Sequence, residues 1–159
     1  MNKKPFHLVI RFSDTMFAVG DVVAIHNSIS EDNGSVWFGK LGQTISQIRV
    51  DLLNKQVEDG KTTYLYLIKG NRKKSSAYRA TLRQVQKEKP EDNRLIPTYY
   101  TEKDIIQYMK AWFRIEHINK IEMSDMGNLK TINSVFPIAE TLRRSSSGHF
   151  LVHESKAIF

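Results

Sequence analysis

Short runs of β-branched and aromatic residues alternate along this chain with polar, turn-forming segments. Runs of this kind are typical of β-strands. They predict strands over residues 6–12, 22–26 and 36–38, with a turn at Gly20-Asp21 before the second. Residues 27–35 combine Asn, Ser, Glu, Asp and Gly, so we expect them to form an exposed loop that leads into the third strand.

Helical periodicity begins after the third strand. Thr44 and Gln47 have the spacing of a capping box. Four apolar residues then recur at helical spacing, namely Ile45, Ile48, Leu52 and Leu53. This pattern predicts a helix over residues 45–58 that ends before Gly60.

A β-hairpin with a long basic tip is predicted in the middle of the chain. Strand-like segments at residues 62–68 and 78–85 flank the polar stretch 70–76, which contains Arg72-Lys73-Lys74. A charged, proline-bounded surface loop follows over residues 86–97.

The last third of the chain mixes short helices and strands. Thr101 can cap a helix over residues 102–109, and Pro137 predicts another that continues to residue 143. Residues 112–118 alternate as a strand, with Trp112 and Arg114 on one face and Phe113 and Ile115 on the other. A final strand is expected over residues 149–152.

This order, about six or seven strands with two or three short helices and no internal repeat, predicts an α+β fold. We expect a small mixed β-barrel with the helices packed around it. At 159 residues, the chain is expected to form a single domain, residues 1–159, that can bury a sizeable core.

Charge narrows the choice of partner. The chain has 24 Lys and Arg against 17 Asp and Glu, a net charge of +7, which favours a polyanion such as nucleic acid. There is no cysteine, so disulfides and thiolate metal sites are excluded. No secretory signal and no run of roughly 18 apolar residues is present, so we expect a cytoplasmic protein without a membrane partner.

The two tryptophans are the leading candidates for ligand contact. Trp37 lies between Gly34 and Lys40, and Trp112 lies between Lys110 and Arg114, so ring-stacking and phosphate-binding residue types occur together. Either tryptophan could instead pack in the core, and for Trp112 core packing is the favoured alternative.

Catalysis finds little support in the sequence. His149 and His153 have no nearby third metal ligand, and there is no nucleophile elbow and no phosphate-binding loop of the Gly-x-x-x-x-Gly-Lys-Ser/Thr type. We therefore predict no catalytic residue, no metal site and no cofactor.

A resemblance to a known family rests on the order of several segments. These are Val19-Gly20-Asp21-Val22-Val23, Trp37-Phe38-Gly39, Tyr64-Leu65-Tyr66-Leu67, Tyr78-Arg79-Ala80-Thr81-Leu82, Ala111-Trp112-Phe113-Arg114-Ile115 and Leu142-Arg143-Arg144-Ser145-Ser146-Ser147-Gly148-His149-Phe150. Together they resemble an EVE-type domain of the PUA-like superfamily, whose relatives include the YTH and ASCH domains. They are also similar to the N-terminal DNA-reading domains of McrBC-type restriction GTPases. The segment Phe38-Gly39-Lys40-Leu41-Gly42 differs from the Trp-Asp-Gly-Val-Arg-Asn type of signature of EVE proteins, which leaves the base open.

The resemblance implies a reader that accepts a modified base between aromatic side chains while loops hold the backbone. By position, the base pocket would be formed by Trp37, Asn33, Ser35, Tyr99, Tyr100 and Trp112. Phosphate contacts would come from Lys40, Arg72, Lys73, Lys74, Arg143, Arg144, Ser145 and Ser146. The two basic loops could also be a solvated turn and a helix end with a glycine turn.

Three functional hypotheses follow. The first is a non-catalytic DNA-binding specificity domain of a restriction or defence system that targets a nuclease or NTPase on the same chain or on a partner. The chain is compatible with being part of such a longer protein. The second is a YTH-like reader of modified RNA, and the third is a protein interaction module whose charge is incidental. DNA is favoured over RNA.

Overall fold

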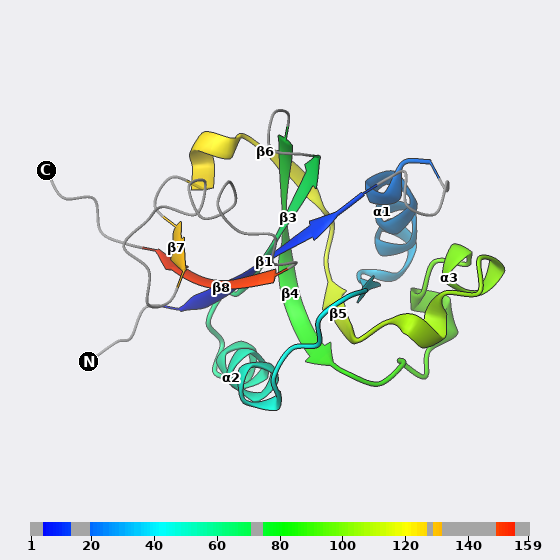
Figure 1. Cartoon of the computed structure of the whole chain (residues 1–159), viewed down its shortest axis with the longest axis horizontal. Coiled ribbons are helices and arrows are strands. Elements are labelled where there is room, and N and C mark those ends of the chain that lie inside the picture. The colour runs from blue at the N-terminus through cyan, green and yellow to red at the C-terminus, as the bar shows by residue number, and fades with distance from the viewer. Residues whose placement is uncertain (1–4, 14–19, 71–74, 127–128, 132–148, 155–159) are drawn as a thin grey trace, which may run out of the picture.

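The computed structural model describes residues 5–13, 20–70, 75–126, 129–131 and 149–154 (Figure 1). Within them lie eight strands: β1 Phe6–Phe12, β2 Val36–Lys40, β3 Tyr64–Gly70, β4 Ser75–Gln86, β5 Ala111–Ile115, β6 Asn119–Ile121, β7 Leu129–Thr131 and β8 His149–Glu154. The helices of this part of the chain are α1 Val22–Asn33, α2 Gln47–Glu58 and α3 Tyr99–Glu102, with short 3₁₀ turns at Asn93–Leu95, Ile106–Tyr108 and Met123–Met126. The predicted helix over 137–143 lies outside the described residues.

The strands form one mixed sheet in the order β2-β5-β4-β3-β1-β8-β7, with β6 paired to β4 beside this path. The β1–β3 pair is parallel, and the other pairs are antiparallel. The mixed α+β fold is confirmed, but the closed barrel is not formed: among the described strands, the path ends at β2 and β7, which do not pair with each other.

Strand β4 joins the two parts of this sheet. Its first half pairs with β3 and β6, and its second half pairs with β5. The register shifts between Leu82 and Gln84, an irregularity that bends a strand and increases its local twist. Figure 1 shows β4 running through the centre of the molecule, with β5 beside it.

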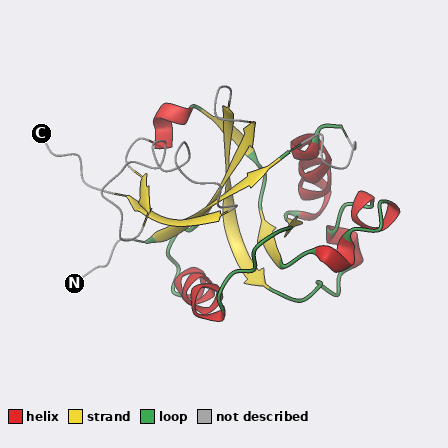
Figure 2. Ribbon diagram, viewed as in Figure 1, coloured by secondary structure: helices red, strands yellow, loops and turns green. Residues whose placement is uncertain are grey.

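The two faces of the sheet bury different clusters. One face, together with α1 and α2, encloses the main core, in which Leu8, Leu65 and Phe113 are fully buried. On the opposite face of β2 and β5, an aromatic cluster packs against the segment that contains α3 (Figure 2). Strand alternation explains the split, because Trp112 points to the second cluster and Phe113 to the first, as predicted. In the described part of the chain, no helix has the length and apolar character needed to span a membrane.

Helix α1 replaces the predicted strand over 22–26 and the predicted loop over 27–35, so both predictions are wrong. The Asp21 carboxylate accepts a hydrogen bond from the Ala24 N–H at 3.0 Å and caps the helix. At the other end, Gly34 has φ +84° and donates its N–H to Ser30 O at 2.7 Å. The β-branched run at its start favours a strand, but these caps and burial of every fourth residue decide for a helix.

Helix α2 is confirmed, but its cap and buried face differ from the prediction. It is capped by Ser46, whose hydroxyl accepts from Arg49 N–H at 3.3 Å, whereas the Thr44 hydroxyl donates to Lys110 O at 3.4 Å. The face that meets the sheet carries Val50, Leu53 and Gln56. Ile48 and Leu52, two of the four apolar residues on which the helix prediction rested, are 81% and 37% exposed, because α2 turns them away from the sheet.

The predicted helix over 102–109 is also wrong. Tyr99 and Tyr100, which precede the predicted helix, form the first turn of α3. Asp104 then adopts φ +55°, which interrupts the helix before the 3₁₀ turn at Ile106–Tyr108.

Three amide side chains connect helices to strands β4 and β1 and to the connection at Ile118 through paired hydrogen bonds. Asn54 on α2 accepts from Val85 N–H and donates to Val85 O, both at 2.8 Å. Gln56 forms the same pair with Phe6, at 2.8 and 2.7 Å, and Asn27 on α1 does so with Ile118. Each amide thus serves as a strand partner for one backbone unit that would otherwise be unsatisfied.

We expect Asn54→Ala to lower the free energy of unfolding by about 2 kcal/mol, because the N–H and C=O of Val85 both lose their partner. Chemical denaturation monitored by circular dichroism measures this loss. Asn33→Ala is the control, since Asn33 is exposed and donates only to Ile29 O within its own helix. Its effect should stay within about 0.5 kcal/mol, and equal losses in the two variants would refute the role of the Asn54 pair.

Candidate functional site

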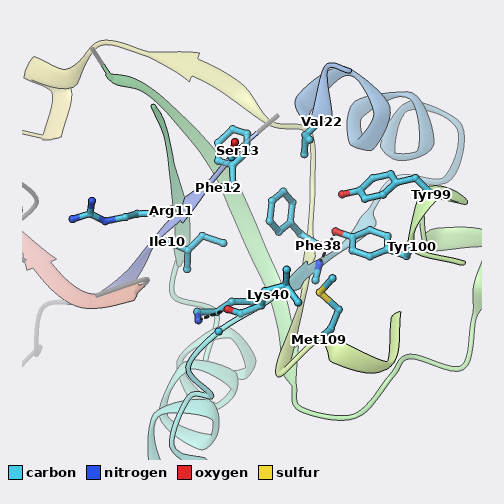
Figure 3. A pocket seen from close by; sticks show the side chains of 13 residues that line it. Ile10, Arg11, Phe12, Ser13, Val22, Phe38, Lys40, Tyr99, Tyr100 and Met109 are labelled. Carbon is cyan, nitrogen blue, oxygen red and sulfur yellow. Dashed lines mark hydrogen bonds between the residues drawn. The ribbon is translucent and has the colours of Figure 1, made fainter. Parts of the chain in front are cut away.

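A pocket of about 350 Å³ lies where β1, β2, α1 and α3 meet (Figure 3). Most of its wall is apolar or aromatic. The lining residues are Ile10, Arg11, Phe12, Ser13, Val22, Phe38, Gly39, Lys40, Leu41, Gly42, Tyr99, Tyr100 and Met109. Ligand pockets of roughly 300–1,000 Å³ with apolar walls and a few polar groups are typical of small-molecule sites, and this pocket is at the small end of that range.

Aromatic rings make up two sides of the pocket. Tyr99 and Tyr100 are stacked, with ring centroids 4.3 Å apart and an interplanar angle of 22°. Phe38 and Phe12 meet edge to face at 6.1 Å. Figure 3 shows Phe38 between Phe12 and the tyrosine pair. The rings beside the cavity are themselves buried, since Phe38, Tyr99 and Tyr100 are 4%, 8% and 1% exposed.

A buried hydrogen-bond chain fixes the Tyr100 ring. Gly39 N–H donates to the Tyr100 hydroxyl at 2.9 Å, and that hydroxyl lies 3.2 Å from Nε2 of His26. The other ring nitrogen of His26 lies 2.8 Å from Val22 O, which can only accept, so Nδ1 carries the proton. In a neutral His26, Nε2 then accepts the Tyr100 proton. This chain connects α1, β2 and α3.

Burial also determines the charge states of His26 and Tyr100 in this chain of hydrogen bonds. Burial lowers the pKa of His26 to about 4, against the opposing effect of the Val22 hydrogen bond, so the ring is neutral at pH 7. Burial and the neighbouring Tyr99 raise the pKa of Tyr100 well above its ordinary value, and its hydroxyl keeps its proton.

Gly39 lets α3 approach β2 closely. A Cβ at this position would lie 2.9 Å from the Met109 Cγ and Sδ atoms and 3.0 Å from Tyr100 Cε1. Glycine at this position is therefore a packing requirement, because any side chain would push Met109 and Tyr100 away from the strand.

Lys40 places a cation at the end of β2. The residue is 5% exposed, and its ammonium group donates to Leu41 O at 3.0 Å and Gln43 O at 2.7 Å. Among the described residues, no carboxylate lies within ion-pairing distance of it. Burial accordingly lowers the pKa of Lys40.

Three of the residues predicted for a ligand site meet in this pocket. Tyr99 and Tyr100 were expected in a base pocket and Lys40 at a phosphate, and all three line the same cavity. The residues that the sequence reasoning missed are Phe38, Gly39 and Met109, together with His26 behind them. Glycine between a phenylalanine and a lysine was the available signal for Gly39. The others depend on tertiary contacts.

The remaining predicted pocket residues lie elsewhere. Trp37 and Trp112 are 5% and 1% exposed and belong to the aromatic cluster on the far face of β2 and β5. Ser35 is buried and accepts from Arg114 Nε at 2.9 Å, and Asn33 is exposed at the end of α1. Their predicted contact with a base stays a prediction.

Two other clefts have a chemistry less suited to a polyanion. Trp37, Lys89 and Arg114 line a cleft of about 410 Å³ that also contains three carboxylates, those of Glu88, Glu91 and Asp92. A cleft of about 430 Å³ near the end of α1 contains Glu31 and Glu116. Carboxylates repel phosphate, so the pocket beside Lys40 is the better candidate. No group of three or more His, Asp or Glu in the described residues could hold a metal ion.

The predicted phosphate-binding residues other than Lys40 lie outside the described residues; they are Arg72, Lys73, Lys74, Arg143, Arg144, Ser145 and Ser146. The described residues contain 16 Lys and Arg against 15 Asp and Glu, a net charge of +1. The whole chain carries +7. Most of the excess positive charge is therefore in segments that the structure does not describe.

We expect acidification to destabilise the protein through His26. Its pKa is about 4 when folded and 6.5 when free, so its contribution to stability is complete above about pH 6.5 and is lost as the pH falls towards 4. Between pH 7 and pH 5, this residue should remove about 2 kcal/mol from the free energy of unfolding. Denaturation at both pH values, repeated on His26→Gln, isolates the effect, and an identical pH dependence in the two proteins would contradict it.

No curated protein and no solved structure matches the chain. A family model described as Pua-like matches residues 8–159, which cover most of β1 and every later described strand. With this match over most of its length, and with a mixed, strongly bent sheet flanked by short helices, the chain belongs to the PUA-like family.

Proposed function

We propose that this PUA-like domain binds DNA without catalysing a reaction and holds one base, flipped out of the helix, in the pocket beside Lys40. PUA-like domains are generally nucleic-acid-binding modules and are typically non-catalytic. The observation that carries the proposal is the composition of the pocket. Aromatic rings from β2 and α3 and a buried cation line one small cavity.

The energetics require further contacts. Stacking a base on aromatic side chains is worth about 1–3 kcal/mol, and removing it from a duplex costs a few kcal/mol. The pocket alone would then roughly balance the cost of flipping. Affinity must therefore come from phosphate contacts, for which Arg72, Lys73, Lys74, Arg143, Arg144, Ser145 and Ser146 are the proposed residues.

The finer identity of the reader is part of the proposal. The resemblance to EVE-type domains and to the N-terminal readers of McrBC-type systems favours a modified base in DNA and a role in restriction or defence. A nuclease or NTPase would then be supplied by another domain or subunit. A YTH-like RNA reader is the second candidate, and dependence on a 2′-hydroxyl would distinguish it. A protein interaction module is the third, and its binding would be insensitive to salt.

We expect Leu41→Trp to weaken oligonucleotide binding at least about tenfold. Leu41 lines the pocket, and an indole there would occupy the space proposed for the base and remove its stacking energy. Fluorescence anisotropy with matched DNA and RNA oligonucleotides, unmodified, adenine-methylated and cytosine-modified, measures the affinity and the preferred base.

Leu52→Trp is the matched control. It introduces the same side chain on the solvent face of α2, where Leu52 is 37% exposed, and it should leave affinity unchanged. If Leu41→Trp bound all oligonucleotides as well as the original protein does, the base would not enter this pocket.

The basic hairpin tip generates a separate prediction. We expect Lys73→Ala combined with Lys74→Ala to weaken binding to all sequences alike and to reduce the slope of log K against log salt by about 2, since each lysine releases one counterion. Anisotropy titrations at several salt concentrations measure the slope. Removing two exposed lysines elsewhere, Lys61 and Lys103, is the control for net charge, and an equal loss of slope there would mean that the tip has no special role.

A further inference from the structure

We propose that the pocket beside Lys40 selects a ring that presents a carboxylate or carbonyl oxygen to the Lys40 ammonium, and that it excludes cationic rings. The inference takes the class of ligand, a nucleobase-like ring, from the proposed function. It adds which chemical groups on the edge of that ring the pocket recognises.

The positive charge of Lys40 is only partly compensated by its hydrogen bonds to neutral carbonyl groups. The ammonium group has three N–H donors, and two of them reach the neutral carbonyls of Leu41 and Gln43. Within the described residues, no carboxylate compensates this cation, although the residue is 5% exposed. A buried charge without an opposite charge is costly, so an acceptor oxygen on a bound ligand would be stabilised there.

The charged side chains that line the pocket are positive. Of the described residues that line it, the charged ones are Arg11 and Lys40, and none is acidic. Figure 3 shows the Lys40 nitrogen joined by a dashed bond to the neighbouring backbone, on the side of the site away from Tyr99 and Tyr100. The Arg11 side chain points away from the rings.

The aromatic side chains of the pocket, together with Lys40, restrict the charge of the ring that can bind. Aromatic cages bind cations through the negative faces of their rings. Here Tyr99, Tyr100 and Phe38 line the same cavity as Lys40. A cationic ring would be repelled by Lys40 at short range, whereas a neutral or anionic ring would stack without that repulsion. The combination therefore favours rings with keto or carboxylate groups.

The expected selectivity follows from the strength of a charge-assisted hydrogen bond. Such a bond to a buried cation should favour a carboxylate-bearing ring over its neutral counterpart by about tenfold to a hundredfold. The same geometry also has a purely structural interpretation, in which Lys40 only holds the turn at residues 41–43. Replacing the Lys40 ammonium distinguishes ligand recognition from a structural role. If the lysine were only structural, its replacement would not change which ring is preferred.

The experiment compares three six-membered rings of similar size by NMR titration of the isotope-labelled protein. Orotate is anionic, uracil is neutral with two carbonyl oxygens, and 1-methylpyridinium is cationic. We expect orotate to bind at least about tenfold more tightly than uracil, and 1-methylpyridinium not to shift the pocket resonances of Gly39 and Gly42. In Lys40→Met, which keeps the shape of the stem, the preference for orotate should disappear.

Controls separate charge from folding. Lys110→Met removes an exposed lysine next to β5 and should retain the full preference for orotate. Lys40→Gln keeps a hydrogen-bond donor without the charge, and it should still bind uracil if Lys40→Met fails to fold. Orotate binding no better than uracil in the original protein, an unchanged preference in the Lys40 variants, or no binding of any ring would overturn the inference.

An oligonucleotide arm distinguishes this inference from the proposed function. Anisotropy is measured with two DNA strands that differ in one base, 5-carboxylcytosine or 5-methylcytosine. If the free rings show the expected order but neither strand binds, the proposed function fails and the selectivity of the pocket stands. If both strands bind equally and orotate has no advantage over uracil, the selectivity fails and DNA binding stands.

Discussion

Strand β4 shares its backbone hydrogen bonds among three other strands, and this sharing joins the two parts of the sheet. Its first half pairs with β3 and β6, and its second half pairs with β5. The register shift between Leu82 and Gln84 bends the strand between these two halves. Because of this bend, β1 and β2, which are far apart in the order of the sheet, face the same core. The contact between Phe12 and Phe38 at 6.1 Å, from which the pocket is built, is a consequence.

A hydrogen bond from the edge strand of the sheet fixes the position of the tyrosine pair. Strand β2 is the last strand at its end of the described sheet, and an edge strand presents backbone groups that need partners. The Gly39 N–H meets this need by donating to the Tyr100 hydroxyl, which in turn is paired with the buried His26. A hydrogen bond that completes the fold thus also fixes one wall of the pocket. Lys40, one residue later, adds the charge that distinguishes this cavity from the acidic clefts.

Local pattern predicted several of the strands correctly. Strand β1 and the β3–β4 hairpin lie where alternation and composition predicted them, and Trp112 and Phe113 occupy opposite faces of β5. Helix α1 was mistaken for a strand because β-branched residues at its start have strand propensity, which is weak compared with capping and burial. Its caps, Asp21 and Gly34, were visible in the sequence. The exposure of Ile48 was not, since helical spacing gives a face but not its direction.

The positive charge, the lack of cysteine, the positions of most strands and the residues that share a face of β5 could all be predicted from the sequence. Which aromatic residues line the pocket beside Lys40 depends on tertiary contacts. Tyr100 and Gly39 are 61 positions apart and meet through one hydrogen bond, while both tryptophans turn to the other face and are buried. The physical reason is that alternation separates two faces of a strand, whereas what covers each face depends on the bend of β4 and the packing of α1 and α3.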